Sequence, residues 1–329
     1  MKFFITGATG FIGTRLALSL AEKGHLVNAL VRSIYKENQL AHPNINIIKG
    51  DIFDIEALKK GAEKTDGIFH LAALAKPWVK DKKLYNKVNV EATKIILEIA
   101  GDYNINKTVI TSSAGTLGPS SGKPLDEKSS RQIDFLNEYE STKFMAEKIA
   151  KDFALQGLNV VIVNPSRVYG PGLLTKSNST TIMIKNYIHG KWRIIPGSGK
   201  RIGNYVFIDD VIEGHIKAME KGVPGAHYIL GGENASYLKF FNTISSVSNK
   251  KYKLFKIPVW MLITFAGIQM FFARIVGRSP LLPPKWVKKY MFDWELNHQK
   301  AKNELDYKPH SLEKGIQKTL KWLQKTPVL

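Results

Sequence analysis

Short apolar runs alternate with helical patterns through the first half of the chain. Runs of strand type occupy residues 2–5, 26–31, 45–48 and 67–69. Residues 14–23, between the first two runs, carry apolar side chains at helical spacing. Strands that alternate with helices in this way predict an α/β fold built on a doubly wound parallel sheet.

The turn between the first strand and the first helix is rich in glycine. Gly7, Gly10 and Gly13 follow one another at intervals of three residues. In a phosphate-binding turn, such glycines permit a tight turn, let the backbone approach a pyrophosphate and let the helix lie close to the strand. The spacing differs from the usual Gly-x-Gly-x-x-Gly, and an ordinary structural turn would also explain it. Taken alone, the turn indicates only that a phosphate would meet a helix N-terminus.

The second strand ends in a cation. In a nucleotide-binding βαβ unit, an acidic residue at this position accepts hydrogen bonds from the 2′-hydroxyl of the adenosine ribose. Here Arg32 follows the strand, and Lys36 lies close behind it. Two cations suit a 2′-phosphate, so the sequence favours NADP(H). A generally basic surface would also explain both residues, so NAD(H) stays possible.

Composition narrows the chemistry. A chain of 329 residues can form a large domain and a smaller one, and the lack of cysteine excludes disulfides, thiolate catalysis and cysteine-ligated zinc. The histidines show no ligand spacing, so we expect no metal site, and packing explains His70 better than metal binding. Met1 leads directly into the first strand without a signal segment, which favours a cytoplasmic protein.

The formal net charge of +20 is high for a globular protein of this size. Such a charge attracts nucleic acid, an anionic membrane surface or an anionic substrate. The lysines are spread along the whole chain, and no zinc-finger spacing or other base-reading motif accompanies them. We therefore expect a small-molecule substrate and no specific nucleic-acid partner.

A second motif places a tyrosine and a lysine on one helix face. Tyr139 and Lys143 are four residues apart within a helical pattern. A nearby ammonium favours the phenolate, and lowering a tyrosine pKa by about three units takes roughly 4 kcal/mol. Upstream, a strand at 108–110 ends in the hydroxyl residues 111–113, at the edge where open α/β sheets bind ligands. A surface pair would show the same spacing, but the order of glycine turn, serine strand end and tyrosine helix favours catalysis.

Several segments together resemble the extended short-chain dehydrogenase/reductase family, of the NAD-dependent epimerase/dehydratase type. They spread over nearly the whole chain. Their combination is specific for the family and the fold, and much less specific for the substrate. The segments are TGATGFIG (6–13), GDI (50–52), HLAA (70–73), NVEAT (89–93), TSSA (111–114), YESTK (139–143), NPSRVYGPG (164–172), YVFIDDV (205–211) and the tail AKNELDYKP (301–309).

The resemblance implies a role for each candidate residue. Tyr139 would exchange a proton with the substrate, Ser113 would bind the substrate oxygen in preference to Ser112, and Lys143 would hold the nicotinamide ribose. Asp51 would bind the adenine amino group. The implied catalytic residues are Ser113, Tyr139 and Lys143; the cofactor-binding residues are Gly7, Thr9, Gly10, Phe11, Ile12, Arg32, Lys36, Asp51, Ile52, Leu71, Ala72, Ala73, Lys143, Pro165 and Ser166; and the substrate contacts are Ala114, Thr116, Arg167 and Asn204.

The resemblance also implies two domains. A Rossmann domain would comprise residues 1–165 and a returning strand and helix at about 204–222. A smaller, discontinuous C-terminal substrate domain would comprise about 166–203 and 223–329. The regular alternation of strands and helices stops near residue 163, which agrees with this division.

Relatives in this family often assemble through two long helices of each subunit. The matching segments here are about 84–100 and 139–154, so the resemblance implies a homodimer. Exposed apolar positions on these segments would support that assembly.

An uncharged, strongly apolar stretch occupies residues 257–273. Basic residues flank it, and its length lies at the short end of transmembrane lengths. We interpret it as a helix that is buried or covers the substrate; a peripheral membrane contact is the second interpretation and a membrane span the third. The first two favour an apolar ligand or environment.

Three functions are consistent with these features. The TSSAGT segment (111–116) and Val31-Arg32 resemble the dihydroflavonol-reductase and 3β-hydroxysteroid-dehydrogenase-like branch, which implies an NADP(H)-dependent oxidoreductase that interconverts a carbonyl and an alcohol on a bulky apolar molecule. The alternative is a nucleotide-sugar epimerase or dehydratase with bound NAD. In that case Arg193, Lys200, Arg201 and Arg274 could supply cations for the diphosphate of the sugar nucleotide. A non-catalytic dinucleotide sensor is expected to lack the tyrosine or the lysine, and this chain retains both.

Overall fold

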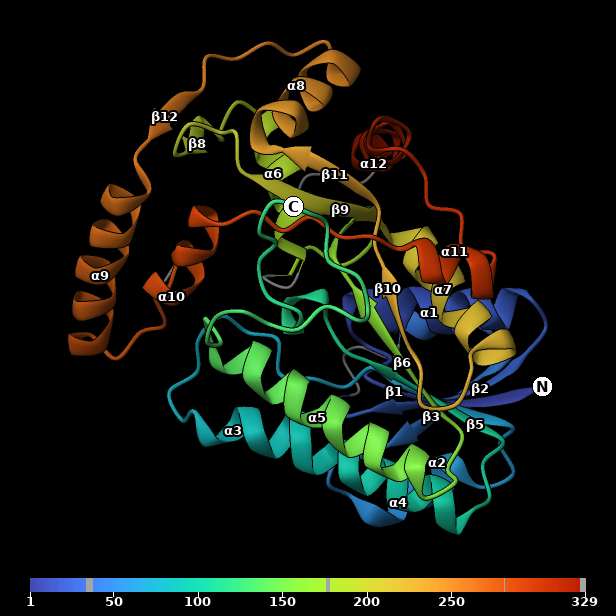
Figure 1. Ribbon diagram of the computed structural model, residues 1–329. Coiled ribbons are helices and arrows are strands. Elements are labelled where there is room, and N and C mark those ends of the chain that lie inside the picture. Colours follow the sequence, from blue (N-terminus) through green and yellow to red (C-terminus); the bar gives the residue numbers. More distant parts are fainter. Residues whose placement is uncertain (34–37, 176–177, 281, 326–329) are drawn as a thin grey trace.

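A parallel sheet of seven strands forms the centre of the molecule. The computed structural model describes residues 1–33, 38–175, 178–280 and 282–325. The strand order is β10-β6-β5-β4-β1-β2-β3 (Figure 1). Because β2 and β4 pair with opposite sides of β1, the order reverses there, and ligands of open α/β sheets bind at such a switch point. The predicted Rossmann fold is confirmed. The strands are β1 (Lys2–Thr6), β2 (Leu26–Val31), β3 (Ile45–Lys49), β4 (Gly67–His70), β5 (Lys107–Thr111), β6 (Val160–Pro165) and β10 (His227–Leu230).

Helices cover both faces of this sheet (Figure 1). One face carries α1, α7 and α11, and the other carries α2, α4 and α5, with α3 and the π-helix η2 leading into α4. Apart from the edge strand β3, the strands are mostly apolar and buried, as a parallel sheet covered on two sides requires. The bounds are α1 (Phe11–Glu22), α2 (Ile55–Ala62), α3 (Lys83–Asn86), η2 (Lys87–Glu91), α4 (Ala92–Asp102), α5 (Glu138–Leu155), α7 (Ile208–Lys221) and α11 (Gln299–Leu305).

A second region lies above the C-terminal ends of these strands (Figure 1). It contains a three-stranded sheet, β11-β9-β7, and a two-stranded sheet, β12-β8. Its elements come from the second half of the chain. They are β7 (Arg167–Tyr169), α6 (Ser179–Ile188), β8 (Ile194–Pro196), β9 (Ile202–Phe207), β11 (Glu233–Ser236), α8 (Tyr237–Ser248), β12 (Phe255–Ile257) and α12 (Leu312–Lys325), and the short 3-10 turn η3 (Ala114–Thr116) lies at the boundary.

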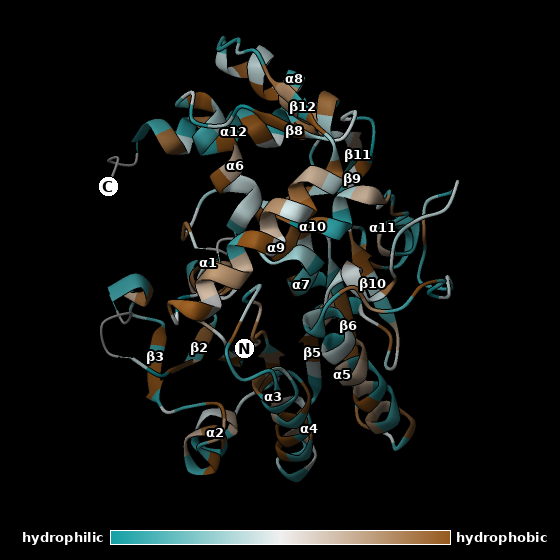
Figure 2. Ribbon diagram, turned by 90° about the vertical axis from the view of Figure 1, so that its left-hand side faces the viewer, coloured by the Kyte–Doolittle hydropathy of each residue, from teal (hydrophilic) through white to brown (hydrophobic). Residues whose placement is uncertain are grey.

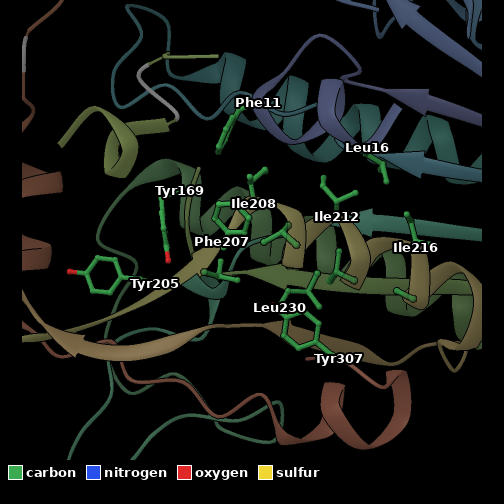
Figure 3. Packing of buried hydrophobic residues seen from close by; sticks show 14 of the residues in the cluster. Phe11, Leu16, Tyr169, Tyr205, Phe207, Ile208, Ile212, Ile216, Leu230 and Tyr307 are labelled. Atoms are coloured by element: carbon green, nitrogen blue, oxygen red, sulfur yellow. The ribbon is translucent and has the colours of Figure 1, made fainter. Parts of the chain in front are cut away.

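One hydrophobic core joins the two regions (Figure 3). It includes Phe11 of α1, Ile212 of α7, Tyr205 of β9 and Leu230 of β10, all of them buried. Tyr307, after α11, closes the cluster and donates a hydrogen bond to the Gly231 carbonyl at 3.0 Å. The C-terminal edge of the main sheet is therefore held in place by a core to which both regions contribute.

The strand expected to return to the main sheet near residue 205 lies elsewhere. Strand β9 pairs with β7 and β11 in the small sheet, whereas α7, which follows it directly, packs against β5 and β6. Strand β10 (His227–Leu230) fills the edge position beside β6, although it lies in the segment 223–329 that was assigned to the substrate domain. A buried apolar strand that runs directly into a helix has the sequence pattern of a Rossmann strand and helix. Only the neighbours with which the strand pairs show whether it belongs to the main sheet or to the small sheet. The remaining domain boundaries stay a prediction.

Helix α9 (Val259–Ile275) is not buried, so the first half of the favoured interpretation of residues 257–273, a buried helix, is wrong. That the helix covers the substrate stays a prediction. The helix lies at the edge of the molecule and packs on α10 (Pro284–Val287) and the 3-10 turn η5 (Lys288–Met291) (Figures 1 and 2). Trp260 and Phe265 are 68% and 64% exposed. Among the helices that the structure describes, none combines the length and apolarity needed to cross a bilayer.

Candidate active site

The glycine-rich turn closes tightly over the N-terminus of α1. Gly7 has a left-handed backbone, with φ +72°, and its carbonyl accepts the Gly10 N–H at 2.9 Å. A Cβ on Gly13 would lie 2.1 Å from the same carbonyl oxygen, so only glycine allows the helix to approach this closely. Gly10 caps α1 without a side-chain hydrogen bond, which leaves the N–H groups of the first turn available to an anion.

The segment after β4 lies against this turn. The Leu71 N–H donates to the Thr6 carbonyl at 3.1 Å. A Cβ on Gly7 would lie 2.6 Å from the Ala72 backbone nitrogen, so the two loops touch through their backbones. The structure thus brings Leu71, Ala72 and Ala73 to the glycine turn at the switch point of the sheet.

His70 connects the strands beneath these loops. Its ring nitrogens lie 2.8 Å from the Thr6 hydroxyl and 3.1 Å from the Thr93 hydroxyl. Burial lowers the pKa of His70 to about 3, and the charge of Lys143 acts in the same direction. The ring is therefore neutral, and its contacts are those of a packed core residue.

The expected adenosine contacts lie together at the ends of β2 and β3. The Arg32 side chain is 81% exposed, and its guanidinium lies 3.6 Å from the Asp51 carboxylate. Ile52 is buried beside them. Lys36, the second expected cation, lies outside the described residues.

Helix α5 carries the expected catalytic pair. Asn137 caps the helix, and its side-chain oxygen accepts the Glu140 N–H at 3.0 Å. Lys143 is 1% exposed, and its Nζ atom has no hydrogen-bond partner within the part of the chain that the structure describes. Burial lowers the pKa of Lys143 to about 8, while the Glu147 carboxylate opposes the shift. A buried ammonium without a partner is costly, and ribose hydroxyls would satisfy it.

Tyr139 lies one helical turn before Lys143. Burial raises the pKa of Tyr139 to about 12, the hydrogen bond with Ser113 opposes this shift, and Glu140 reinforces it. We expected the Lys143 ammonium to lower this pKa, but burial dominates here. The phenol is therefore protonated at neutral pH, which is the form that donates a proton to a carbonyl oxygen.

A buried carboxylate organises the serine strand end. Glu147 accepts hydrogen bonds from the Ser112 hydroxyl, from the Thr116 hydroxyl at 2.9 Å and from the Asn164 amide at 2.7 Å. Burial raises the pKa of Glu147, and these three hydrogen bonds oppose the shift. Because Ser112 is held by Glu147, the arrangement favours Ser113 as the serine that meets the substrate.

A second buried carboxylate ties α5 to a late segment of the chain. Glu140 is fully buried and pairs with Arg131 at 2.9 Å and with Lys289 of η5 at 2.6 Å. Burial lowers the pKa of Lys289, and Glu140 opposes the shift. On the adjoining α10, the Trp286 ring centroid lies 6.5 Å from that of Tyr139. The C-terminal region thus reaches the N-terminus of the catalytic helix.

Three of the four expected substrate contacts are engaged elsewhere. The Thr116 hydroxyl is bound to Glu147, and Ala114 packs in a small apolar cluster. The Asn204 amide exchanges two hydrogen bonds with the Gly232 backbone. These contacts show that Thr116 and Asn204 have hydrogen-bond partners within the fold, and their roles as substrate contacts stay predictions.

Arg167 remains a substrate candidate. Its guanidinium donates to the Tyr237 hydroxyl at 2.6 Å and lies 5.6 Å from the centre of the Tyr205 ring. It follows Ser166 directly, at the end of β6. The residue therefore offers a cation within an aromatic cluster next to the expected nicotinamide position.

These features fit a bound NAD(P). The glycine turn leaves a space that the Cβ of any other residue would fill. The Lys143 Nζ atom and the buried Ser166 hydroxyl both lack a hydrogen-bond partner among the described residues. Thr9, Phe11 and Ile12 lie in the turn and the start of α1, and Pro165 ends β6. The roles of the expected site residues stay predictions.

The sequence interpretation missed both buried carboxylates. Glu140, Lys143 and Glu147 are spaced three and four residues apart, so they share one helix face. If the helix face that carries Lys143 is assumed to be buried, this spacing indicates that Glu140 and Glu147 are buried beside it. Lys289 carries no comparable signal, because its partner lies on a distant part of the chain.

Comparison with known proteins agrees with the geometry. A model of the NAD dependent epimerase/dehydratase family matches residues 3–231. A protein of Synechocystis sp. named "Putative dihydroflavonol 4-reductase" is 31% identical over 328 residues, covering 98% of this chain and 94% of the relative. A UDP-N-acetyl-alpha-D-glucosaminuronate decarboxylase of Bacillus cytotoxicus is 26% identical over 337 residues, covering 98% of each chain. The crystal structure of gox2253 has a TM-score of 0.81 and 29% identity, again covering 98% of each chain.

Proposed function

The chain belongs to the NAD dependent epimerase/dehydratase family, and from this premise we propose that it is an NADP(H)-dependent oxidoreductase that interconverts a carbonyl and an alcohol on a bulky, apolar small molecule. The observation that carries the proposal is the buried ammonium of Lys143, which has no hydrogen-bond partner among the residues that the structure describes and lies one helical turn from Tyr139 and its Ser113 partner. The name of the Synechocystis relative supports a reductase.

The proposed mechanism assigns one task to each side chain. NADP(H), when bound, supplies or accepts the hydride. Ser113 donates a hydrogen bond to the substrate oxygen, and Lys143 binds the ribose hydroxyls. Tyr139 donates its proton to the carbonyl oxygen during reduction and accepts the alcohol proton during oxidation. A pKa of about 12 keeps the phenol protonated, which is the form that donates the proton during reduction.

Arg32 supports the preference for NADP(H). It stands where an acid would bind a free 2′-hydroxyl, and its exposed guanidinium is only loosely paired with Asp51 at 3.6 Å. We predict that Arg32→Asp raises the KM for NADPH by at least roughly tenfold, because a phosphate contact becomes a repulsion, and changes the KM for NADH much less. Arg278→Asp, at another exposed arginine, is the matched control. An unchanged ratio of the two KM values would place the phosphate contact elsewhere.

The surroundings of Tyr139 support an apolar substrate. Trp286 lies beside the phenol, and Tyr237 and Tyr290 pack edge to face at 5.5 Å around Arg167. Aromatic walls of this kind stabilise bulky apolar ligands, with a few polar groups to orient them.

The alternative, a nucleotide-sugar epimerase or dehydratase with bound NAD, draws support from the Bacillus cytotoxicus relative. Two of the cations expected to bind a diphosphate are otherwise engaged: Arg193 lies over the Tyr252 ring at 4.1 Å, and Arg201 pairs with Asp293 at 2.8 Å. The oxidoreductase is therefore preferred.

A substrate screen distinguishes the two functions. Carbonyl compounds and UDP- or dTDP-sugars are offered to the purified protein, and NADPH absorbance and product mass are followed together. The proposal expects NADPH consumption matched by a product two hydrogens heavier. Turnover of a sugar nucleotide without added cofactor, by protein purified with bound NAD, would contradict it.

A further inference from the structure

The outward face of α9 is apolar. Trp260, Phe265, Ile268, Phe271, Phe272 and Ile275 are all more than half exposed. At 100° per residue they project within an arc of about 140°, where Thr264 is the only polar residue. Ala266, on the opposite side, is buried toward α10. The helix thus reverses the usual pattern of a surface helix, whose apolar face is the buried one.

The chain around α9 is uniformly basic. From Asn234 to Phe292 the sequence contains ten lysine or arginine residues and no aspartate or glutamate. Lys250, Lys251, Lys253 and Lys256 precede the helix and are exposed, as is Arg278 after it. An aromatic helix that is flanked in sequence by cations is typical of helices that lie in the headgroup layer of anionic membranes.

The position of α9 leaves this face open. In Figure 1 the helix stands at the edge of the molecule beyond β12, and in Figure 2 it faces the viewer. Its 17 residues give a length of about 25 Å, long enough to lie along a membrane surface. A second copy of this chain is disfavoured as the partner, because a two-fold interface would bring two segments of equal positive charge together.

We propose that α9 docks on an anionic phospholipid bilayer, lying parallel to its surface with the aromatic face toward the acyl chains. Lys250, Lys251, Lys253 and Lys256 contact the lipid phosphates. The docked surface adjoins the candidate active site, because α9 packs on α10 and Trp286 of α10 lies beside Tyr139. The docking itself does not depend on the proposed reaction.

Vesicle co-sedimentation of the full chain tests this proposal. Vesicles contain phosphatidylglycerol and phosphatidylcholine in equal parts, or phosphatidylcholine alone. We expect binding to the anionic vesicles at least roughly tenfold tighter than to the neutral ones, and weaker at high salt. The triple variant Trp260→Ser/Phe265→Ser/Phe271→Ser should lose at least roughly tenfold in affinity.

Two further variants keep the result interpretable. Leu26→Ser/Leu155→Ser/Val223→Ser removes exposed apolar side chains elsewhere and should bind like the wild type. Replacing the four lysines before α9 by glutamine should abolish the preference for anionic vesicles. In the wild type, brominated lipid should quench part of the tryptophan fluorescence, and Trp260→Phe should remove that part.

Three outcomes would overturn the proposal. One is no binding to anionic vesicles at low salt. The second is equal loss of binding in the α9 triple variant and its control. The third is a dimer, seen by sedimentation velocity, that the α9 variant dissociates while neither protein binds vesicles.

Discussion

Helices α5 and α9 depart from the usual distribution of side chains in opposite directions. Helix α5 buries Glu140, Lys143 and Glu147, whereas α9 exposes Trp260 and Phe265. Charged residues are almost never fully buried without partners, and large exposed apolar patches on a soluble surface are equally unusual. Both placements cost free energy, so each indicates a site whose partner is a ligand or a surface.

The two helices differ in how far the protein itself offsets that cost. Glu147 accepts three hydrogen bonds, and Glu140 pairs with two cations, so both acids are satisfied within the fold. Lys143 Nζ and the α9 face have no such partners among the described residues. The comparison therefore distinguishes two kinds of group. Groups that are paired within the fold support the site, and groups without such a partner are the ones that we expect to bind a ligand or a surface.

Removing the unpaired charge of α5 should have the largest effect. We predict that Lys143→Met lowers kcat/KM by at least roughly 10³-fold, because the ribose contact and the proton-transfer geometry are lost together. Lys148→Met, at an exposed lysine on the same helix, should leave the rate within about twofold. Steady-state kinetics with NADPH and the substrate found in the screen measure both variants. Equal rates in Lys143→Met and the wild type would mean that the buried ammonium does not bind the ribose.

The same residue should impose a pH-dependent cost on stability. The pKa of Lys143 is about 8 in the folded protein and near 10.5 when unfolded, so between these values the unfolded state binds more protons and stability rises with pH. The cost below pH 8 is about 3 kcal/mol. Urea unfolding should therefore show Lys143→Met more stable than the wild type at pH 7, with the difference shrinking by pH 10. A difference that stays constant with pH would contradict the depressed pKa.

Removing a paired charge should destabilise the fold. Glu147→Ala leaves two hydroxyls and the Asn164 amide without their acceptor, which should lower the free energy of unfolding by about 3 kcal/mol. The control Glu98→Ala breaks only an exposed pair with Lys94 and should change it by less than about 0.5 kcal/mol. Urea unfolding compares the two. Equal effects would show that the Glu147 hydrogen bonds contribute no more than a surface ion pair.

Removing exposed aromatic side chains should have the smallest effect. The triple serine variant of α9 should change the free energy of unfolding by less than about 0.5 kcal/mol per site, because these side chains bury little surface in the folded protein. In contrast, Phe240→Ala, at a ring stacked on Tyr205, should lower it by about 3 to 5 kcal/mol. A large loss of stability in the α9 variant, seen by thermal unfolding, would show that the helix supports the fold.

Local signals made much of the site predictable from the sequence. The glycine turn, Arg32 and the Tyr139–Lys143 pair depend on neighbours within a few residues, and the structure places them at the switch-point edge as expected. Long-range pairing was not predictable. Glu140 meets Lys289 only after the chain folds, and β9 and β10 differ in their partners rather than in their apolar patterns.

The burial expected for α9 was wrong for a related reason. Residues 257–273 carry no charge and are mostly apolar, and burial is the ordinary explanation of such a composition. Whether another element covers the helix is decided by tertiary packing, and here α10 and η5 cover one side while the other stays exposed.

The most direct test of the central claim, that Tyr139 transfers the proton beside a bound dinucleotide, is single-turnover kinetics of Tyr139→Phe together with calorimetric NADPH titration. The variant loses the phenol hydroxyl and keeps the ring. We predict that NADPH binds with an affinity within about threefold of the wild type while hydride transfer slows by at least roughly 10³-fold. Hydride transfer at the wild-type rate, with NADPH bound equally well, would contradict the assignment.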